Sequence, residues 1–204
     1  MENLATFAMQ ALADFRTVGA VAPSSRYLTR AMVDPLPLRH ARVVVELGCG
    51  TGTVTQMLLS QMPRKAVLLA FEINARFSRY LKEKIRDPRL VLINASAESV
   101  REEVQRRGYE RVDAVASSLA LALMSDRLRH SILSDSGGIL HRAGVFTQYH
   151  YLHGLQWQEG RLARFPGSRL LRQYFRSVER TIVWRNFPPA YVFSCRGALR
   201  PQAC

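Results

Sequence analysis

The chain has 204 residues, of which 48% are hydrophobic and 22% are charged, the ordinary balance of a single globular domain. No run of about eighteen apolar residues occurs, which excludes a membrane-spanning helix. We also expect no secretory signal, because Glu2 and Asp14 stand where such a signal has a basic start and an apolar run. The three cysteines show no metal-ligand spacing, and their odd number favours a reduced, cytoplasmic location.

Charge is the unusual feature of the composition. The 29 Lys and Arg residues outnumber the 16 Asp and Glu residues, which gives a formal net charge of +13. Such a surface attracts polyanions, either nucleic acid or an anionic lipid leaflet. Codon usage in a GC-rich genome would also enrich arginine, so the charge alone leaves the partner open.

The first expected elements are two helices joined by a loop. Residues 3–16 place apolar side chains at three- and four-residue spacing, which predicts an amphipathic helix. That helix would lie either in a membrane interface or on the protein core. Residues 19–25 predict a loop whose serines cap the next helix, and Asp34-Pro35 ends that helix.

Strands and helices alternate from residue 43 onward. Strands are predicted at 43–47, 66–71, 90–93, 112–116 and 144–149, and helices between them at 54–61, 75–86, 97–107 and 121–134. This alternation predicts an α/β fold with a parallel sheet and helices on both faces. Residues 177–184 and 190–194, separated by a proline-rich turn at 186–189, predict an edge hairpin.

A glycine-rich turn follows the first predicted strand. The segment 46–52 reads Glu-Leu-Gly-Cys-Gly-Thr-Gly and opens a helix, so its backbone amides can approach a ligand closely. Glu72 ends the second strand, where an acidic side chain can accept both hydroxyls of a ribose. Thr53 stands where a dinucleotide motif has its third glycine, which favours an adenosine ligand without a pyrophosphate.

Residues 40–150 resemble the class I S-adenosylmethionine-dependent methyltransferases in this glycine turn and acidic strand end. The resemblance implies a Rossmann-like, seven-stranded, mostly parallel sheet with strand order 3-2-1-4-5-7-6 and an antiparallel last strand. It implies S-adenosylmethionine as cofactor, with the glycines beside its methionine part, Glu72 on the ribose and residues 94–97 beside adenine. Ser96 stands where many relatives have Asp, so the amide of Ala97 is an alternative adenine contact. The expected cofactor residues are Ser24, Ser25, Glu46, Gly48, Gly50, Thr51, Gly52, Glu72, Ile73, Ser96, Ala97 and Ser117.

The segment after the fourth strand bears on the substrate. Methylases of exocyclic base nitrogens resemble one another in an Asn/Asp-Pro-Pro-aromatic motif there, whereas residues 116–121 read Ala-Ser-Ser-Leu-Ala-Leu. The motif is absent, which argues against base methylation.

Three segments instead resemble the bacterial phospholipid N-methyltransferases: residues 19–28, 117–119 and 186–192. The chain departs from that family at Ala120, where relatives have Pro, and in the order of residues 146–149. The resemblance implies methylation of phosphatidylethanolamine, through its mono- and dimethyl derivatives, towards phosphatidylcholine.

Substrate residues follow from the headgroup's chemistry. Arg26 is the candidate donor to the lipid phosphate. Tyr27, Tyr149 and Tyr151 are candidates to face the quaternary ammonium, and Tyr149 and Tyr27 are the expected catalytic residues. Structural alternatives remain for each: residues 23–25 as a helix cap, residues 186–189 as a turn, and Tyr149 as a core aromatic.

The expected organisation is one methyltransferase domain over residues 1–204. Residues 1–39 would form a membrane-binding helix and a lid, and residues 40–204 the catalytic core. The expected partners are phosphatidylethanolamine and an anionic phospholipid surface on the inner membrane face, because residues 161–204 hold nine arginines and Glu179 as the single acid. Neither nucleic acid nor metal is expected. The alternatives are an rRNA adenine N-methyltransferase and a catalytically inactive module that binds the cofactor or a membrane.

Overall fold

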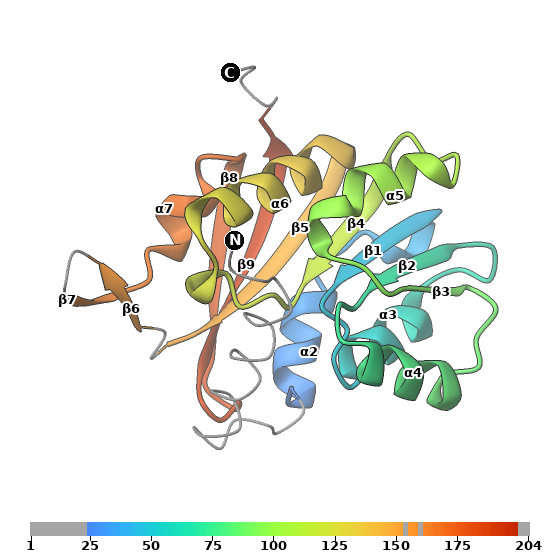
Figure 1. Ribbon diagram of the computed structural model, residues 1–204, viewed down its shortest axis with the longest axis horizontal. Helices are drawn as coiled ribbons and strands as arrows, with labels where there is room; N and C mark the ends of the chain where they lie inside the picture. The colour runs from blue at the N-terminus through green and yellow to red at the C-terminus, as the bar shows by residue number, and fades with distance from the viewer. Residues whose placement is uncertain (1–23, 153–154, 159–160, 200–204) are drawn as a thin grey trace.

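The computed structural model describes residues 24–152, 155–158 and 161–199 (Figure 1). The predicted helix at 3–16, and most of the predicted loop at 19–25, lie outside the described residues. Side chains are described for residues 24–152 and 165–199.

A seven-stranded sheet with the order β3-β2-β1-β4-β5-β9-β8 forms the centre of the fold. Strands β1 to β5 are parallel, and β9 runs antiparallel to both of its neighbours, β5 and β8. This arrangement confirms the predicted 3-2-1-4-5-7-6 order and the C-terminal hairpin. The strands are β1 (Val43–Leu47), β2 (Val67–Phe71), β3 (Leu90–Ile93), β4 (Val112–Ser117), β5 (Leu140–Tyr151), β8 (Phe175–Val183) and β9 (Ala190–Ala198).

Helices cover both faces of the sheet, as predicted for a parallel sheet. Figure 1 shows α2, α3 and α4 on one face, and α5 and α6 on the other. The α-helices are α2 (Arg26–Val33), α3 (Thr53–Gln61), α4 (Ala75–Lys84), α5 (Val100–Arg106), α6 (Asp126–Ile139) and α7 (Gly167–Leu171). Three short 3₁₀ turns, η1 (Leu38–His40), η2 (Ala97–Ser99) and η3 (Leu121–Leu123), lie in the connections.

The predicted helix at 121–134 is displaced toward the C-terminus. Ser125 caps α6 by accepting a hydrogen bond from the Leu128 amide, so the helix starts at Asp126. It continues through Gly137 to Ile139, although glycine disfavours helix. Gly137 and Ile139 are buried, and a Cβ at Gly137 would make an ordinary van der Waals contact, at 3.5 Å, with Cβ of Ala198 on β9. Tertiary packing therefore outweighs the local sequence preference.

The segment between β5 and β8 contains elements that the sequence did not predict. Strands β6 (Leu155–Gln158) and β7 (Arg161–Arg164) pair antiparallel in a separate two-stranded sheet, and α7 follows them. The available signal was the alternation of Leu155 and Trp157 with glutamines ahead of Gly160, a pattern typical of a hairpin. Strand β5 also starts four residues earlier than predicted, at Leu140 rather than at 144.

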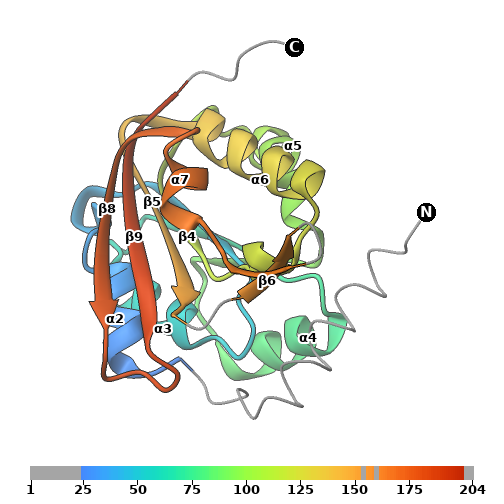
Figure 2. The ribbon, with the colours of Figure 1, turned by 90° about the vertical axis from the view of Figure 1, so that its left-hand side faces the viewer.

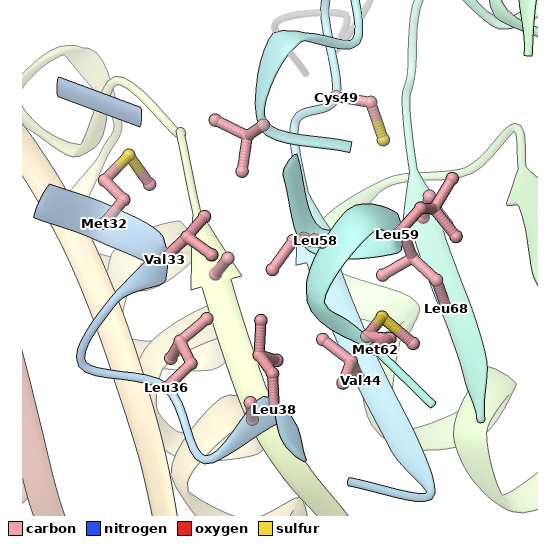
Figure 3. Packing of buried hydrophobic residues seen from close by; sticks show 14 of the residues in the cluster. Met32, Val33, Leu36, Leu38, Val44, Cys49, Leu58, Leu59, Met62 and Leu68 are labelled. Atoms are coloured by element: carbon pink, nitrogen blue, oxygen red, sulfur yellow. The ribbon is translucent and has the colours of Figure 1, made fainter. Parts of the chain in front are cut away.

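The α2 helix attaches the N-terminal part of the described chain to the sheet. Its residues Leu28, Met32 and Val33 are fully buried. Figure 3 shows Met32 and Val33 in a cluster that also holds Leu58 of α3 and Met62, which directly follows this helix. Because burying such side chains stabilises by about 1.5–3 kcal/mol each, α2 is fixed beside α3 rather than loosely attached.

A carboxyl group lies in the centre of this core. Glu46 of β1 has no exposed surface, and both of its carboxylate oxygens lack a hydrogen-bond partner among the described residues. Burial, with a smaller contribution from the charge of Glu72, raises the pKa of Glu46 to about 7, although the neighbouring Thr55 and Cys49 lower it. The folded protein therefore keeps Glu46 mostly protonated below about pH 7.

Replacing Glu46 by Gln is expected to reduce the pH dependence of stability. The unfolded chain loses this proton near the ordinary pKa of 4.5, whereas the folded protein keeps it until about pH 7. The folded state holds the extra proton between these values, so the free energy of unfolding falls as pH rises through this window. The loss is on the order of 3 kcal/mol in the wild type and should be absent in Glu46→Gln. Urea unfolding at a series of pH values measures it.

Glu83→Gln is the matched control, because Glu83 is an exposed carboxylate on α4. It should keep the wild-type profile. Parallel stability profiles for wild type and Glu46→Gln would contradict the assignment of a protonated, buried Glu46.

Candidate functional site

The glycine turn between β1 and α3 has an open backbone at its middle. Gly48, Gly50 and Gly52 have φ angles of +79°, +51° and +84°, a region that favours glycine. A Cβ at Gly52 would lie 2.4 Å from Cδ2 of Leu81, so this glycine is required for packing on α4. No atom lies within 4 Å of a Cβ position at Gly50. A ligand can therefore approach the backbone at Gly50.

Glu72 links this turn to the end of β2. Its Oε2 accepts a hydrogen bond from the Gly50 amide at 2.8 Å, and its Oε1 accepts one from the Asn74 amide at 2.8 Å. Burial raises the pKa of Glu72, and these two amides oppose the shift. Each carboxylate oxygen has two lone pairs, so both can still accept a hydroxyl proton from a ligand.

Asn94 holds the next strand end against Glu72. Its Nδ2 donates to the backbone oxygens of Glu72 at 2.7 Å and of Ile73 at 3.2 Å. The Ile73 side chain is 41% exposed, so an apolar surface lies next to the Glu72 carboxylate. The sequence placed Asn94 beside adenine but did not indicate this bridging role.

The predicted adenine segment is a short capped turn. Ser96 Oγ accepts a hydrogen bond from the Glu98 amide at 3.3 Å and so caps η2. Ala97 is buried directly after it. The Ser96 side chain thus has a structural role, which leaves the backbone of this turn as the group available to a ligand.

The end of β4 packs against the glycine turn. The Ser118 amide donates to the oxygen of Leu47 at 2.8 Å, and Cδ2 of Leu119 lies 3.1 Å from a Cβ position at Gly48. Gln148 fixes this connection, since its Nε2 donates to the oxygens of Leu119 and Tyr149 at 2.9 and 2.7 Å. Sequence reasoning missed Gln148, although a glutamine in a predicted central strand, two residues after Phe146, is a signal of a specific role.

Two segments that the sequence singled out separately meet in the structure. The Ser25 amide donates to Oδ1 of Asn186 at 3.1 Å, across 161 positions of sequence. The Nδ2 of Asn186 donates to the oxygen of Pro188 at 2.7 Å, and Asn186 is buried. Ser25 Oγ also accepts from the Leu28 amide, which confirms its predicted capping of α2.

Tyr149 and Tyr151 form an aromatic pair on the α2 side of β5. Their ring centroids are 5.4 Å apart, and the rings meet edge to face at 75°. Burial raises the pKa of Tyr149 well above its ordinary value, and Tyr151 adds to the shift, while the Ser24 hydroxyl opposes it. The Tyr149 hydroxyl therefore stays protonated at physiological pH.

Tyr27 lies between two guanidinium groups. Arg26 donates to its hydroxyl at 2.9 Å and Arg185 at 3.5 Å, and their Cζ atoms lie 4.9 and 5.3 Å from the ring centroid. These two hydrogen bonds lower the pKa of Tyr27. Arg185 was not predicted, because only the folded chain brings it to residues 26 and 27.

Two further residues predicted for the cofactor site, Ser117 and Glu46, are buried. Ser117 is buried, and its Oγ has no partner among the described side chains. Glu46, at the end of β1 before the glycine turn, is fully buried. His150 packs against Phe165 and Phe193 on the opposite face of β5, where burial lowers its pKa to about 4. Within residues 24–152 and 165–199 no cluster of His, Cys, Asp and Glu fits a metal ion.

Comparisons with known proteins agree with this geometry. Residues 44–144 match a methyltransferase domain family. An ornithine lipid N-methyltransferase from Singulisphaera acidiphila is 28% identical over 181 residues, which cover 88% of each chain.

Solved structures share the fold at low sequence identity. The 1,6-didemethyltoxoflavin-N1-methyltransferase of Burkholderia thailandensis, solved with S-adenosylhomocysteine, has a TM-score of 0.65 and 18% identity, covering 95% of this chain and 88% of its own. The N-methyltransferase NodS of Bradyrhizobium japonicum has a TM-score of 0.61 and 14% identity, covering 82% and 90%. These two likenesses concern the fold alone.

The predicted strand order is confirmed, and the glycine turn faces the end of the adjacent strand as a nucleoside site requires. The cofactor of this protein is S-adenosylmethionine. The open backbone at Gly50, the acceptor oxygens of Glu72 and the exposed Ile73 side chain fit this molecule. The chain therefore belongs to the class I S-adenosylmethionine-dependent methyltransferases.

Proposed function

We propose that this enzyme methylates the amine of a lipid headgroup, with phosphatidylethanolamine and its mono- and dimethyl derivatives as substrates. The observation that carries the proposal is the hydrogen bond between Ser25 and Asn186, which joins the two segments most similar to lipid methyltransferases. The match to an ornithine lipid N-methyltransferase supports a lipid amine as methyl acceptor.

The cofactor would lie over the glycine turn and the end of β2. Gly48, Gly50, Thr51 and Gly52 would face its methionine part, Glu72 its ribose, and the Ile73 side chain and Ala97 backbone its adenine. When bound, the cofactor supplies an electrophilic methyl carbon, and its sulfur leaves with the bonding electron pair. The protein's task is then to align the amine with that carbon and to exclude water.

The headgroup carries opposite charges at its two ends, and the described residues match both. Arg26 and Arg185 present two guanidinium groups, which suit a phosphate. The Tyr149 and Tyr151 rings would face the ammonium, whose charge grows permanent as methyl groups accumulate; such contacts contribute about 0.5–2 kcal/mol.

The amine must lose a proton before it attacks the methyl carbon. The Tyr149 hydroxyl is protonated and therefore does not take this proton as a base, but its oxygen can accept a hydrogen bond from the amine and orient its lone pair. We assign Tyr149 this orienting role. Tyr27 holds Arg26 and Arg185 in place, and the proton leaves to solvent.

Ornithine lipid is a second candidate substrate, favoured by the name of the relative. Ornithine presents a carboxylate where phosphatidylethanolamine has a phosphate, and arginine pairs with either group. The same site can therefore serve both headgroups.

The enzyme would act at a membrane surface, because its substrate's acyl chains stay in the bilayer. Among the residues that the structure describes, no helix has the length and apolar content to cross a bilayer. We propose peripheral binding to the anionic inner leaflet, driven by the net charge of +13, with the segment 3–16, which lies outside the described residues, as a second membrane contact.

Incubation with labelled S-adenosylmethionine and lipid vesicles tests the proposal. Label should enter phosphatidylethanolamine, and chromatography should resolve the mono-, di- and trimethylated products. Vesicles with ornithine lipid in place of phosphatidylethanolamine decide between the two headgroups. Label found in added rRNA but in neither lipid would support the RNA alternative and contradict the proposal.

Glu72→Gln is expected to weaken binding of S-adenosylhomocysteine at least about tenfold. The substitution keeps the size of the side chain but removes the charge that strengthens hydrogen bonds from the ribose hydroxyls. Calorimetric titration measures the affinity. Glu110→Gln is the control, because Glu110 is exposed and precedes β4 at the opposite edge of the sheet. Equal affinities for wild type and Glu72→Gln would remove Glu72 from the cofactor site.

Tyr149→Ala and Tyr149→Phe separate the ring from the hydroxyl. If the ring stabilises a methylated ammonium, Tyr149→Ala should raise KM for dimethylated lipid about tenfold, whereas Tyr149→Phe should retain that KM and lower kcat. Affinity for S-adenosylhomocysteine should stay unchanged in both. If the two variants behave alike in KM, the aromatic face has no role in headgroup binding.

A further inference from the structure

Large apolar side chains are exposed at the turn that joins β8 to β9. Phe187 is 90% exposed and Trp184 is 67% exposed, and Ile182 precedes them at 36%. Phe187 and Trp184 are the two most exposed large hydrophobic residues in the described part of the chain. We call residues 182–189 the hairpin tip. Leaving this much aromatic surface in water is unfavourable, which points to a partner that covers it.

The hairpin tip lies on the side of the sheet where the parallel strands have their carboxyl ends, which is also the side of the cofactor site. Tyr151, at the carboxyl end of β5, pairs with Ala190, the first residue of β9 after the tip. Because β1 to β5 are parallel, their carboxyl ends share that side with the glycine turn. Figures 1 and 2 both show the β8–β9 turn beyond the end of β5 and next to α2.

The tip is held rigidly from behind while its aromatic residues face outward. Val183, Asn186 and Ala190 are buried, whereas Trp184 and Phe187 between them are exposed. Asn186 fixes the turn through its bonds to Ser25 and Pro188, and the Leu152 amide donates to the oxygen of Pro189 at 2.9 Å. Exposure of the two aromatics is thus imposed by the buried residues that alternate with them.

The charge around the tip is positive. Arg180 and Arg185 flank Trp184 in the sequence, Arg26 meets Arg185 at the Tyr27 ring, and residues 180–196 contain no acid. Exposed Trp and Phe next to arginines match the interface of an anionic bilayer, where the rings enter the headgroup region and the guanidinium groups meet phosphates.

We propose that the hairpin tip inserts into the surface of an anionic lipid bilayer, with Trp184 and Phe187 as its anchors. The inference rests on the proposed lipid substrate and adds the orientation of the enzyme to it. With the tip inserted, Arg26, Tyr27 and Arg185 meet the plane of the headgroups, so that a lipid reaches the site without leaving the membrane.

Cosedimentation with vesicles of phosphatidylglycerol and phosphatidylcholine tests the proposal on the full chain. These lipids carry no methyl-accepting amine, so membrane binding is measured apart from catalysis. Trp184→Ala combined with Phe187→Ala should lower the partition coefficient at least about tenfold. Tyr80→Ala, which removes a 45% exposed aromatic from α4, should leave it within about twofold of wild type. Unchanged affinity for S-adenosylhomocysteine verifies that both variants are folded.

Fluorescence gives a second, direct measurement. The sequence has two tryptophans, so Trp157→Phe leaves Trp184 as the single emitter. Adding the vesicles should shift its emission to the blue, and brominated acyl chains should quench it. Emission unchanged by vesicles, together with full cosedimentation of the double variant, would overturn insertion of the tip. Vesicle binding by the protein with no role for Trp184 would assign the anchor to another segment.

The two proposals fail in distinguishable ways. Normal insertion of Trp184 with no methylation of phosphatidylethanolamine or ornithine lipid would contradict the proposed function and leave the membrane contact standing. If the double variant methylates vesicle lipid at wild-type rates, the proposed insertion of the hairpin tip is contradicted and the proposed function is not. Loss of that methylation in the double variant, with retained activity on a short-chain lipid in detergent, is the result expected.

Discussion

The hydrogen bond from the Gly50 amide to the Glu72 carboxylate fixes the geometry on which the active site depends. Parallel pairing places β1 and β2 side by side, and the amides of Gly48 and Cys49 attach the start of the glycine turn to the oxygen of Phe71. Glu72 joins them with a charge-assisted bond at 2.8 Å in a mostly buried place, where such bonds are strong. Asn94 extends the same connection to β3. The cofactor surface is therefore shaped before any ligand arrives.

Two acidic side chains, Glu46 and Glu72, lie close to the glycine turn, although the protein as a whole is basic. Glu46 lies fully buried under the turn and Glu72 at its rim, and burial raises the pKa of both. A protonated Glu46 avoids placing a second negative charge beside Glu72 in the core. Glu72 can then keep its charge for the amides of Gly50 and Asn74 and for the proposed ribose contact.

The substrate side depends on a different long-range contact. Ser25 and Asn186 bring the start of α2 to the hairpin tip, and this contact places both Arg26 and Arg185 against the Tyr27 ring. The α2 helix is in turn fixed by its buried residues against α3, as Figure 3 shows. The proposed headgroup contacts and the proposed membrane contact would thus share one rigid unit, on the same side of the sheet as the cofactor site.

The sequence by itself determined the alternation of strands and helices and the glycine turn with Glu72. The strand order followed from the resemblance of the sequence to the class I methyltransferases. These features depend on local signals: hydrophobic periodicity, glycine in a turn, and an acid at a strand end. Only the tertiary structure decided that α6 continues through Gly137 to Ile139, and which roles Asn94, Gln148 and Arg185 have. It also decided that Trp184 and Phe187 are exposed. The physical reason is the same for each: their partners lie far along the chain, and packing against those partners outweighs the short-range preferences that a sequence displays.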